Sequence, residues 1–236
     1  MRTLGILGGL GPESTIDYYR AILALCRERR PNAGSPPIVI HSLDVDNVIA
    51  MLDAGRFSHL AAYLSSGIET LARAQVDFGC IAANTPHIVF DEVQKRSAIP
   101  LLSIVSSTAN AAARKQLKKV GLFGTGFTMR ASFYPDEFQK AGFAVIRPTQ
   151  QEQELIHGIY IHELLKNKFL PESREKLREI AQRMMRDDGI EALVLAGTEL
   201  PLLLRGSELK GLDFLDTTLI HVKAIVDALL EDRGSA

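Results

Sequence analysis

Short apolar runs alternate with longer amphipathic stretches along the whole of this chain. Several of the runs are almost entirely apolar, as is typical of strands buried on both faces of a parallel sheet. Strands that alternate with helices form parallel sheets flanked by helices, so the pattern predicts an α/β protein. We expect strands at Thr3–Leu7, Pro37–Ser42, Phe78–Ala82, Leu101–Ile104, Lys119–Phe123, Ala144–Ile146, Ala192–Leu195 and Phe214–Leu215.

Two amphipathic stretches give the clearest predictions of helices. Residues 172–188 lie between Pro171 and Gly189, which are typical of a helix start and a helix end. Residues 58–75 predict a second helix of similar length. The apolar faces consist of Leu177, Ile180, Ala181 and Met184 in the first helix and of Leu60, Leu64, Ile68 and Leu71 in the second.

The two halves of the chain repeat one pattern. Residues 4–9 resemble residues 120–125, where a short apolar run ends in small residues, and residues 80–87 resemble residues 193–200. Matched positions in the two segments are 75 residues apart in the first half and 73 residues apart in the second. Similar strand ends at similar spacing predict two similar α/β halves.

We expect this repeat to produce two pseudo-symmetric domains with mainly parallel sheets. Residues 1–100 plus 208–236 would form the first domain, and residues 101–207 the second. Ligands of open parallel sheets bind beyond the carboxyl ends of the strands. Four strand ends rich in small residues, two from each domain, would then face an active-site cleft between the domains.

The composition fits a globular protein, with 46% hydrophobic and 23% charged residues. The formal net charge of −1 favours neither nucleic acid nor a membrane surface as a partner. The N-terminal residues lack the pattern of a signal peptide, and no apolar run approaches the ~20 residues that span a bilayer, so we expect a cytoplasmic protein. Cys26 and Cys80 are expected to be buried in the core rather than joined in a disulfide.

The first candidate site follows the first strand, in the segment Gly8–Thr15. Gly9 and its neighbours place backbone N–H groups at the start of a helix, an arrangement that suits a small anion. A tight turn capped by Ser14 or Thr15 explains the same residues equally well. A dinucleotide site fits poorly, because Ser14 stands where the third glycine of that motif would fall.

Two further candidate sites are strand ends that the repeat matches to each other. After the first strand end, Asn84 and Thr85 offer compact hydrogen-bonding groups and His87 opens a helix, although a turn and a capping residue explain them too. After the second, Thr198 and Glu199 occupy the matching place. We expect Glu199 to lie opposite His87 across the cleft.

The remaining polar segments offer one more candidate site, a predicted helix cap and no metal site. Thr125 and Thr128 follow another strand end and could bind a carboxylate together with backbone amides. Asp216 and the two threonines after it are more typical of a helix cap than of a site. No metal site is expected, since His157 and His162 do not share a helical face and no cysteine or carboxylate pair completes a set.

Taken in order, these segments resemble the aspartate/glutamate racemase family, in particular its aspartate racemase and broad amino-acid racemase branch. The matching motifs, which cover essentially the whole chain, are GILGGLGPESTIDYYR at the start, ANTPH at 83–87, LFGTGFTM at 122–129, AGTEL at 196–200 and DTTLIH at 216–221. The resemblance implies a substrate cleft between two α/β domains, no pyridoxal phosphate or other cofactor, and a homodimer. It implies a small amino acid or dicarboxylate ligand, bound by Gly9, Asn84, Thr85, Thr125, Thr128 and Thr198.

Family members carry two cysteines, in the patterns C-N-T-x-H and G-C-T-E. One thiolate removes the α-proton of an amino acid and the other thiol returns a proton on the opposite face. At these two places this chain has Ala83 and Gly197, neither of which can accept a proton. The acid/base groups that remain are His87 and Glu199, which assist the cysteines in the family. Cys80 lies three residues before Ala83 and on the opposite face of the strand, where it cannot substitute.

Three functions are compatible with these residues. The first is a racemase-family protein that binds a small amino acid or dicarboxylate and has lost two-thiol racemisation. The second is an enzyme of altered chemistry, a one-base proton transfer, lyase or hydrolase reaction that uses His87 or Glu199. The third is a non-catalytic ligand-binding or regulatory protein. All three share the same cleft, so the fold alone cannot separate them.

Overall fold

The structure, a computed structural model, describes residues 1–32, 34–204 and 209–231. The contacts between Cα atoms divide the chain into two compact units. Unit 1 holds Met1–Ile104 and the chain from His221, and unit 2 holds Val105–Ile220. The chain therefore passes between the units twice, at the start of helix α5 (Ile104–Arg114) and one turn into helix α11 (Thr217–Leu230).

Unit 1 is built on a four-stranded parallel sheet with the strand order β2-β1-β3-β4. Its strands are β1 (Leu4–Gly8), β2 (Ile38–Ser42), β3 (Phe78–Ile81) and β4 (Leu101–Leu102). Its helices are α1 (Pro12–Arg29), α2 (Val45–Asp53), α3 (Phe57–Arg73), the 3-10 helix η1 (Thr85–Val89) and α4 (Phe90–Arg96), together with most of α11.

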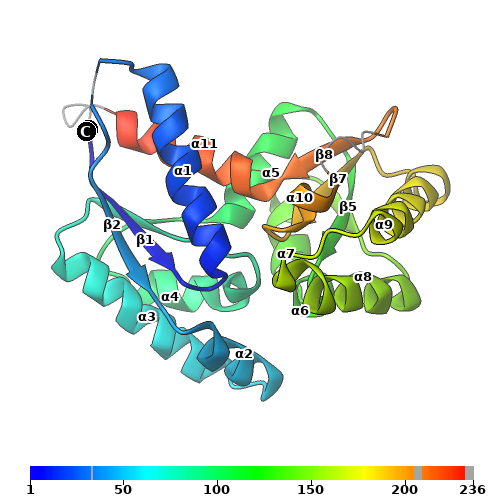
Figure 1. Cartoon of the computed structure of the whole chain (residues 1–236), viewed down its shortest axis with the longest axis horizontal. Coiled ribbons are helices and arrows are strands. Elements are labelled where there is room, and N and C mark those ends of the chain that lie inside the picture. The colour runs from blue at the N-terminus through cyan, green and yellow to red at the C-terminus, as the bar shows by residue number, and fades with distance from the viewer. Residues whose placement is uncertain (33, 205–208, 232–236) are drawn as a thin grey trace. The chain divides into compact units, whose positions relative to one another are not determined.

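The alternation of side chains along β1 explains how helices cover both faces of this sheet. Leu4 and Ile6 belong to a buried cluster with α1 and α11, whereas Gly5 and Leu7 face α3. Figure 1 shows α1 and the last part of α11 beside each other, and α3 below β1 and β2. An ion pair between Arg29 and Asp227 joins α1 to α11.

Unit 2 repeats the arrangement with the strand order β6-β5-β7-β8, again parallel throughout. Its strands are β5 (Lys119–Gly124), β6 (Ala144–Ile146), β7 (Ala192–Ala196) and β8 (Asp213–Asp216). Its helices are α6 (Gly126–Arg130), α7 (Phe133–Lys140), α8 (Gln150–His162), the 3-10 helix η2 (Leu164–Lys166), α9 (Pro171–Arg183), a π-helical turn η3 (Met184–Asp188) and α10 (Leu200–Leu204), in addition to most of α5.

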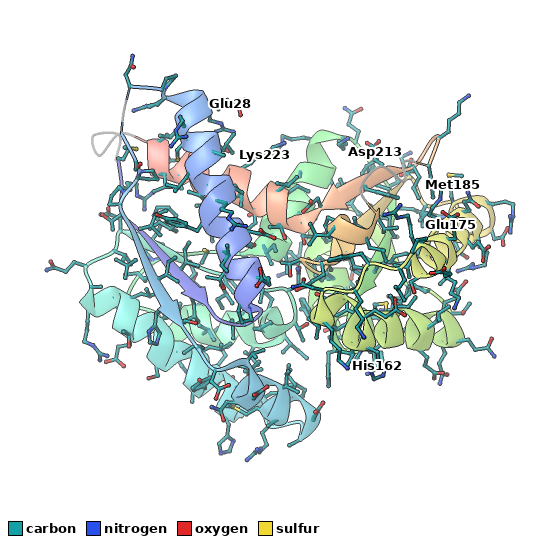
Figure 2. The ribbon with its side chains drawn as sticks, viewed as in Figure 1. Glu28, His162, Glu175, Met185, Asp213 and Lys223 are labelled. Carbon is teal, nitrogen blue, oxygen red and sulfur yellow. The ribbon has the colours of Figure 1, made fainter. Side chains whose placement is uncertain are left out.

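The core of unit 2 lies between the sheet and helices α8, α9 and α10. Leu193 and Leu195 of β7 pack in one buried cluster with Ile156 and Tyr160 of α8 and Leu177 of α9. Polar and charged side chains point outward from the same elements, as Figure 2 shows for His162 on α8, Glu175 on α9 and Asp213 at the start of β8.

The predicted fold class is confirmed: two four-stranded parallel sheets flanked by helices make an α/β protein. All eight predicted strands are present, although β4 is shorter than expected because helix α5 begins at Ile104. The predicted helices at residues 58–75 and 172–188 are α3 and α9 with its π-helical turn, and the residues of both predicted apolar faces are buried.

The unit boundaries differ from those expected from the sequence. The sequence assigned everything from residue 208 to the first domain, but β8 pairs with β7 and so belongs to the sheet of unit 2. The return to unit 1 therefore comes at His221, inside α11, and the earlier crossing comes at residues 104–105 rather than 100–101. Residues 205–208 lie outside the described residues.

Candidate functional site

The loop after β1 is a tight turn in which glycines are required. Gly9 has a φ of +77°, and a Cβ atom there would lie 2.2 Å from the Leu43 carbonyl oxygen. The backbone N–H of Gly9 donates to Thr15 Oγ1 at 2.9 Å, and Ser14 Oγ donates to the carbonyl of Ala82 at 3.1 Å. Thr15 therefore closes the turn and Ser14 ties the start of the helix to the end of β3. The tight turn is present, but the predicted capping by Ser14 or Thr15 is wrong, because Gly11 is the N-cap of α1 and no side chain caps it.

The end of β3 carries Ala83 and Asn84, both almost completely buried. Thr85 and Pro86 then begin the helix η1. Register places this strand end beside the first loop, since Leu7 of β1 pairs with Ile81 of β3. The structure thus brings the predicted residues of unit 1 to one edge of its sheet.

His87 holds two backbone segments together. Its Nε2 atom accepts a hydrogen bond from the Ile104 N–H at 3.3 Å, so the proton resides on Nδ1, which lies 2.9 Å from the Ala83 carbonyl and donates to it. The ring stacks on Phe90 at 4.9 Å. Burial, reinforced by repulsion from His221, lowers the pKa of His87 to about 3, so the ring is neutral. Both ring nitrogens are occupied by the protein's own backbone.

His221 makes a second connection of the same kind. Tyr18 donates its hydroxyl proton to His221 Nδ1 at 2.9 Å, and His221 Nε2–H donates to the Leu102 carbonyl at 3.1 Å. Burial lowers the pKa of His221 to about 4. Residues 102–104, where β4 leads into α5, are therefore held by two neutral histidines. Asp216 in the same motif caps α11 by accepting from Leu219 N–H at 3.0 Å, as predicted.

In unit 2 the end of β5 carries the two predicted threonines. Thr125 caps α6 by accepting from the Thr128 N–H at 3.2 Å, and the two hydroxyl oxygens lie 3.2 Å apart. The backbone N–H of Gly126 donates to His157 Nδ1 at 3.1 Å. His157 thereby supports this strand end, and in the described part of the chain no group of three or more metal-ligating side chains gathers.

A side chain that the sequence did not single out packs against the end of β7. Tyr160, on the buried face of α8, places its ring against Gly197, so that a Cβ atom on residue 197 would lie 2.4 Å from Cε2 and 2.8 Å from the phenolic oxygen. The Tyr160 hydroxyl donates to Glu199 Oε2 through a short hydrogen bond. Thr198 Oγ1 donates to the same oxygen at 2.9 Å.

This pair is largely removed from solvent. Tyr160 is 6% and Glu199 7% exposed, so the carboxylate depends on the protein's own donors. Burial, followed by the nearby Glu199 carboxylate, raises the pKa of the Tyr160 phenol well above its usual value. A tyrosine between apolar residues of a helix is a weak sequence signal, but a buried tyrosine needs a polar partner, and Glu199 is that partner.

Strand register establishes which residues of the two units correspond. Leu7 pairs with Ile81 in one sheet and Phe123 with Leu195 in the other, so Ala83 and Gly197 each lie two residues past the matched pair. Two residues further along each chain segment, Thr85 corresponds to Glu199.

By the same register, the counterpart of His87 is Pro201. Pro201 lies in α10 and is buried. The second unit thus has no histidine where the first has His87.

Neither of the chain's two cysteines lies at a strand end. Cys26 and Cys80 are free and buried, as predicted, and both belong to the core cluster of unit 1. Burial raises the pKa of Cys80 to about 12, which keeps the thiol protonated at neutral pH. The end of β7 in unit 2 therefore has Tyr160 and Glu199, and no thiol.

The fold and these strand ends define a class of protein: two parallel α/β units that share one topology and carry small polar residues at matched strand ends. The profile of the Asp/Glu/Hydantoin racemase family matches residues 7–225, and the chain belongs to this family.

Individual relatives agree with this assignment. A broad-specificity amino-acid racemase, RacX, from Bacillus subtilis (strain 168) is 25% identical over 157 residues, which cover 64% of this chain and 66% of that protein. The crystal structure of an aspartate racemase homologue from Pyrococcus horikoshii OT3 has a TM-score of 0.83 and 30% identity, covering 98% of this chain and 100% of the other. That of a candidate Asp/Glu racemase from Yersinia pestis has a TM-score of 0.90 and 29% identity, with the same coverage.

Proposed function

We propose that this protein binds a small amino acid or dicarboxylate at the strand ends described above and does not carry out two-thiol racemisation. The observation that carries the proposal is the position of Tyr160, whose ring fills the space that a side chain at residue 197 would occupy. The family membership and the names of the relatives support an amino-acid ligand.

The polar groups at these strand ends suit a carboxylate. Asn84 and Thr85 follow β3, and Thr125, Thr128 and Thr198 lie on the matched ends in unit 2. Side-chain amides and hydroxyls, assisted by backbone N–H groups, are the usual partners of a carboxylate that needs a fixed orientation. The remaining parts of the proposal are a cytoplasmic homodimer that uses no pyridoxal phosphate. No helix in the described ranges is long and apolar enough to cross a membrane.

The proposed loss of two-thiol chemistry depends on both strand ends. Ala83 offers a methyl group, and Gly197 offers no side chain. His87 is unsuited to replace a thiol, because Ile104 and Ala83 already occupy its two ring nitrogens. The bound amino acid would consequently keep its configuration.

Calorimetry and thermal shift with L- and D-aspartate, L- and D-glutamate, succinate and malate test the binding. We expect at least one of these carboxylates to bind and to raise the melting temperature, whereas the corresponding amino-acid amides should not. Asn84→Ala should weaken the binding, and Asn47→Ala, which removes an exposed asparagine on α2, should not. Absence of binding across the whole panel would contradict the proposal, and rapid interconversion of enantiomers would contradict the loss of racemisation.

A further inference from the structure

The phenol of Tyr160 lies beside the position from which a thiol at residue 197 would project. Its oxygen is 2.8 Å from the ideal Cβ position of residue 197 and its ring carbon Cζ is 3.0 Å away. The phenolic oxygen therefore lies next to the atom from which a side chain at residue 197 would extend. The Tyr160 hydroxyl therefore lies near the position at which family members carry a cysteine thiol.

The hydrogen bonds around Tyr160 provide a route for a proton. The hydroxyl donates to Glu199 Oε2, and Thr198 donates to that same oxygen. The carboxylate can take the phenolic proton without any movement of heavy atoms, because the two oxygens are already in direct contact. Neither Tyr160 nor Glu199 is fully enclosed, since each keeps a small exposed fraction.

We propose that Tyr160 and Glu199 form an acid/base pair that replaces the second thiol and exchanges a proton on one face of the carbon beside a bound carboxylate. The proposal rests on the proposed function, since its substrate is the small amino acid or dicarboxylate named there. Tyr160 contacts the substrate, and Glu199 accepts the proton that the Tyr160 hydroxyl releases.

The step is balanced within the pair. The substrate's C–H bond breaks, its electron pair remains on carbon as the carboxylate-stabilised carbanion, and the proton passes to the Tyr160 oxygen. At the same time the phenolic proton moves to Glu199 Oε2. The pair begins with one negative charge and ends neutral, so it never carries two charges in a buried site. The reverse movement returns a proton to the same face of the carbon.

Retention of configuration follows because the pair acts on one face of the carbon only. Inversion requires a second group that delivers a proton to the opposite face, whereas Tyr160 and Glu199 share a single proton route on one face. Exchange with solvent is consequently expected without racemisation, and on only one enantiomer of each amino acid.

The test is proton NMR in D₂O with L- and D-aspartate and L- and D-glutamate, each at a concentration that saturates binding. We expect the wild-type protein to replace the α-proton of one enantiomer with deuterium while chirality is unchanged. Tyr160→Phe keeps the ring that fills the space at residue 197 and removes only the hydroxyl. It should lower the exchange rate about 100-fold or more and leave binding of the amino acid nearly unchanged.

Tyr134→Phe is the matched control, because Tyr134 is a fully buried tyrosine of the same unit with hydrogen bonds to Thr108 and Thr217. It should leave the exchange rate unchanged. Binding without exchange, or exchange that survives Tyr160→Phe, would overturn the acid/base pair and leave the proposed function standing. Absence of binding by the wild-type protein would instead overturn both.

Discussion

Gly197 has no room for a side chain, because the ring of Tyr160 packs against it. A Cβ atom at this position would lie 2.4 Å from the tyrosine ring, which is far inside van der Waals contact. Because Tyr160 belongs to the buried core of unit 2 and its hydroxyl is bound to Glu199, the ring has no free space to enter. The two residues therefore form one packing unit.

Gly197→Cys should lower the free energy of unfolding by about 1–3 kcal/mol, the usual result of forcing extra atoms into a packed core. Urea denaturation measures this change. Adding Tyr160→Leu should restore part of the loss, so the two substitutions should not be additive. Gly158→Cys on α8 is the control, because a Cβ atom there meets nothing within 4 Å. Equal destabilisation by Gly197→Cys and Gly158→Cys would contradict the steric argument.

At the residue scale, the sequence motifs did not reveal every side chain of the candidate site. Ala83, Gly197 and Glu199 were found because they occupy motif positions, whereas Tyr160 lies 37 positions before Gly197 on a different element. Its phenol meets Glu199 only because α8 packs on β7, and such a long-range contact leaves no local pattern. His87 had a visible motif, but its engagement with Ile104 N–H depends on the position of α5.

At the scale of elements, the spacing of apolar residues was sufficient to predict which segments are strands and which are helices. Strands buried on both faces and helices with one apolar face gave the correct element types, because burial imposes those periods directly. Helix ends were predicted where a residue carries its own signal, as Gly189 does with its positive φ of 71°. The end of β4 was not predicted, because it depends on how far Leu101 and Leu102 can pair with β3.

The connection between β4 and α5 should make the protein sensitive to acid. His87 and His221 hold residues 102–104, and their pKa values are about 3 and 4 against an ordinary value of 6.5. Below pH 6.5 these two histidines therefore bind protons in the unfolded chain but remain neutral in the folded chain. The stabilisation is complete above pH 6.5 and is lost as the pH falls toward 4, by up to about 1.4 kcal/mol per pH unit for each histidine.

Urea denaturation at several pH values measures this dependence. His87→Gln should reduce the slope between pH 6.5 and 4, since the amide can donate and accept without titrating. His59→Gln replaces an exposed histidine on α3 and should leave the slope as it is. Parallel curves for His87→Gln and the wild-type protein would contradict the assignment of this slope to His87.

At the scale of the whole molecule, one topology is used twice. The repeat seen in the sequence corresponds to β1 with β5 and β3 with β7, in sheets whose strand orders match one to one. Sequence alone could predict this, because equal spacing of similar strand ends follows from equal topology. The unit boundaries could not be read in the same way, since both fall within or at the start of helices α5 and α11, where composition does not change.

The repeated topology suggests how two-thiol chemistry could be restored. Ala83→Cys and Gly197→Cys place thiols at both matched strand ends, but the ring of Tyr160 blocks the second. Adding Tyr160→Leu makes room for that thiol. We expect the triple variant to interconvert L- and D-aspartate or L- and D-glutamate, which circular dichroism follows, because it carries thiols at both positions where the resemblance to the racemase family places the catalytic cysteines.

The double variant that retains Tyr160 is the decisive comparison. It carries the same two thiols and differs only in the side chain that fills the space at residue 197, so it should racemise at least about 10-fold more slowly than the triple variant. Variants of Cys26 and Cys80 to Ala should leave the triple variant's rate unchanged, because both thiols are in the core of unit 1. A folded triple variant that binds the amino acid and fails to racemise it would show that Ala83 and Gly197 are not equivalent to the two thiol positions, however well their strand registers match.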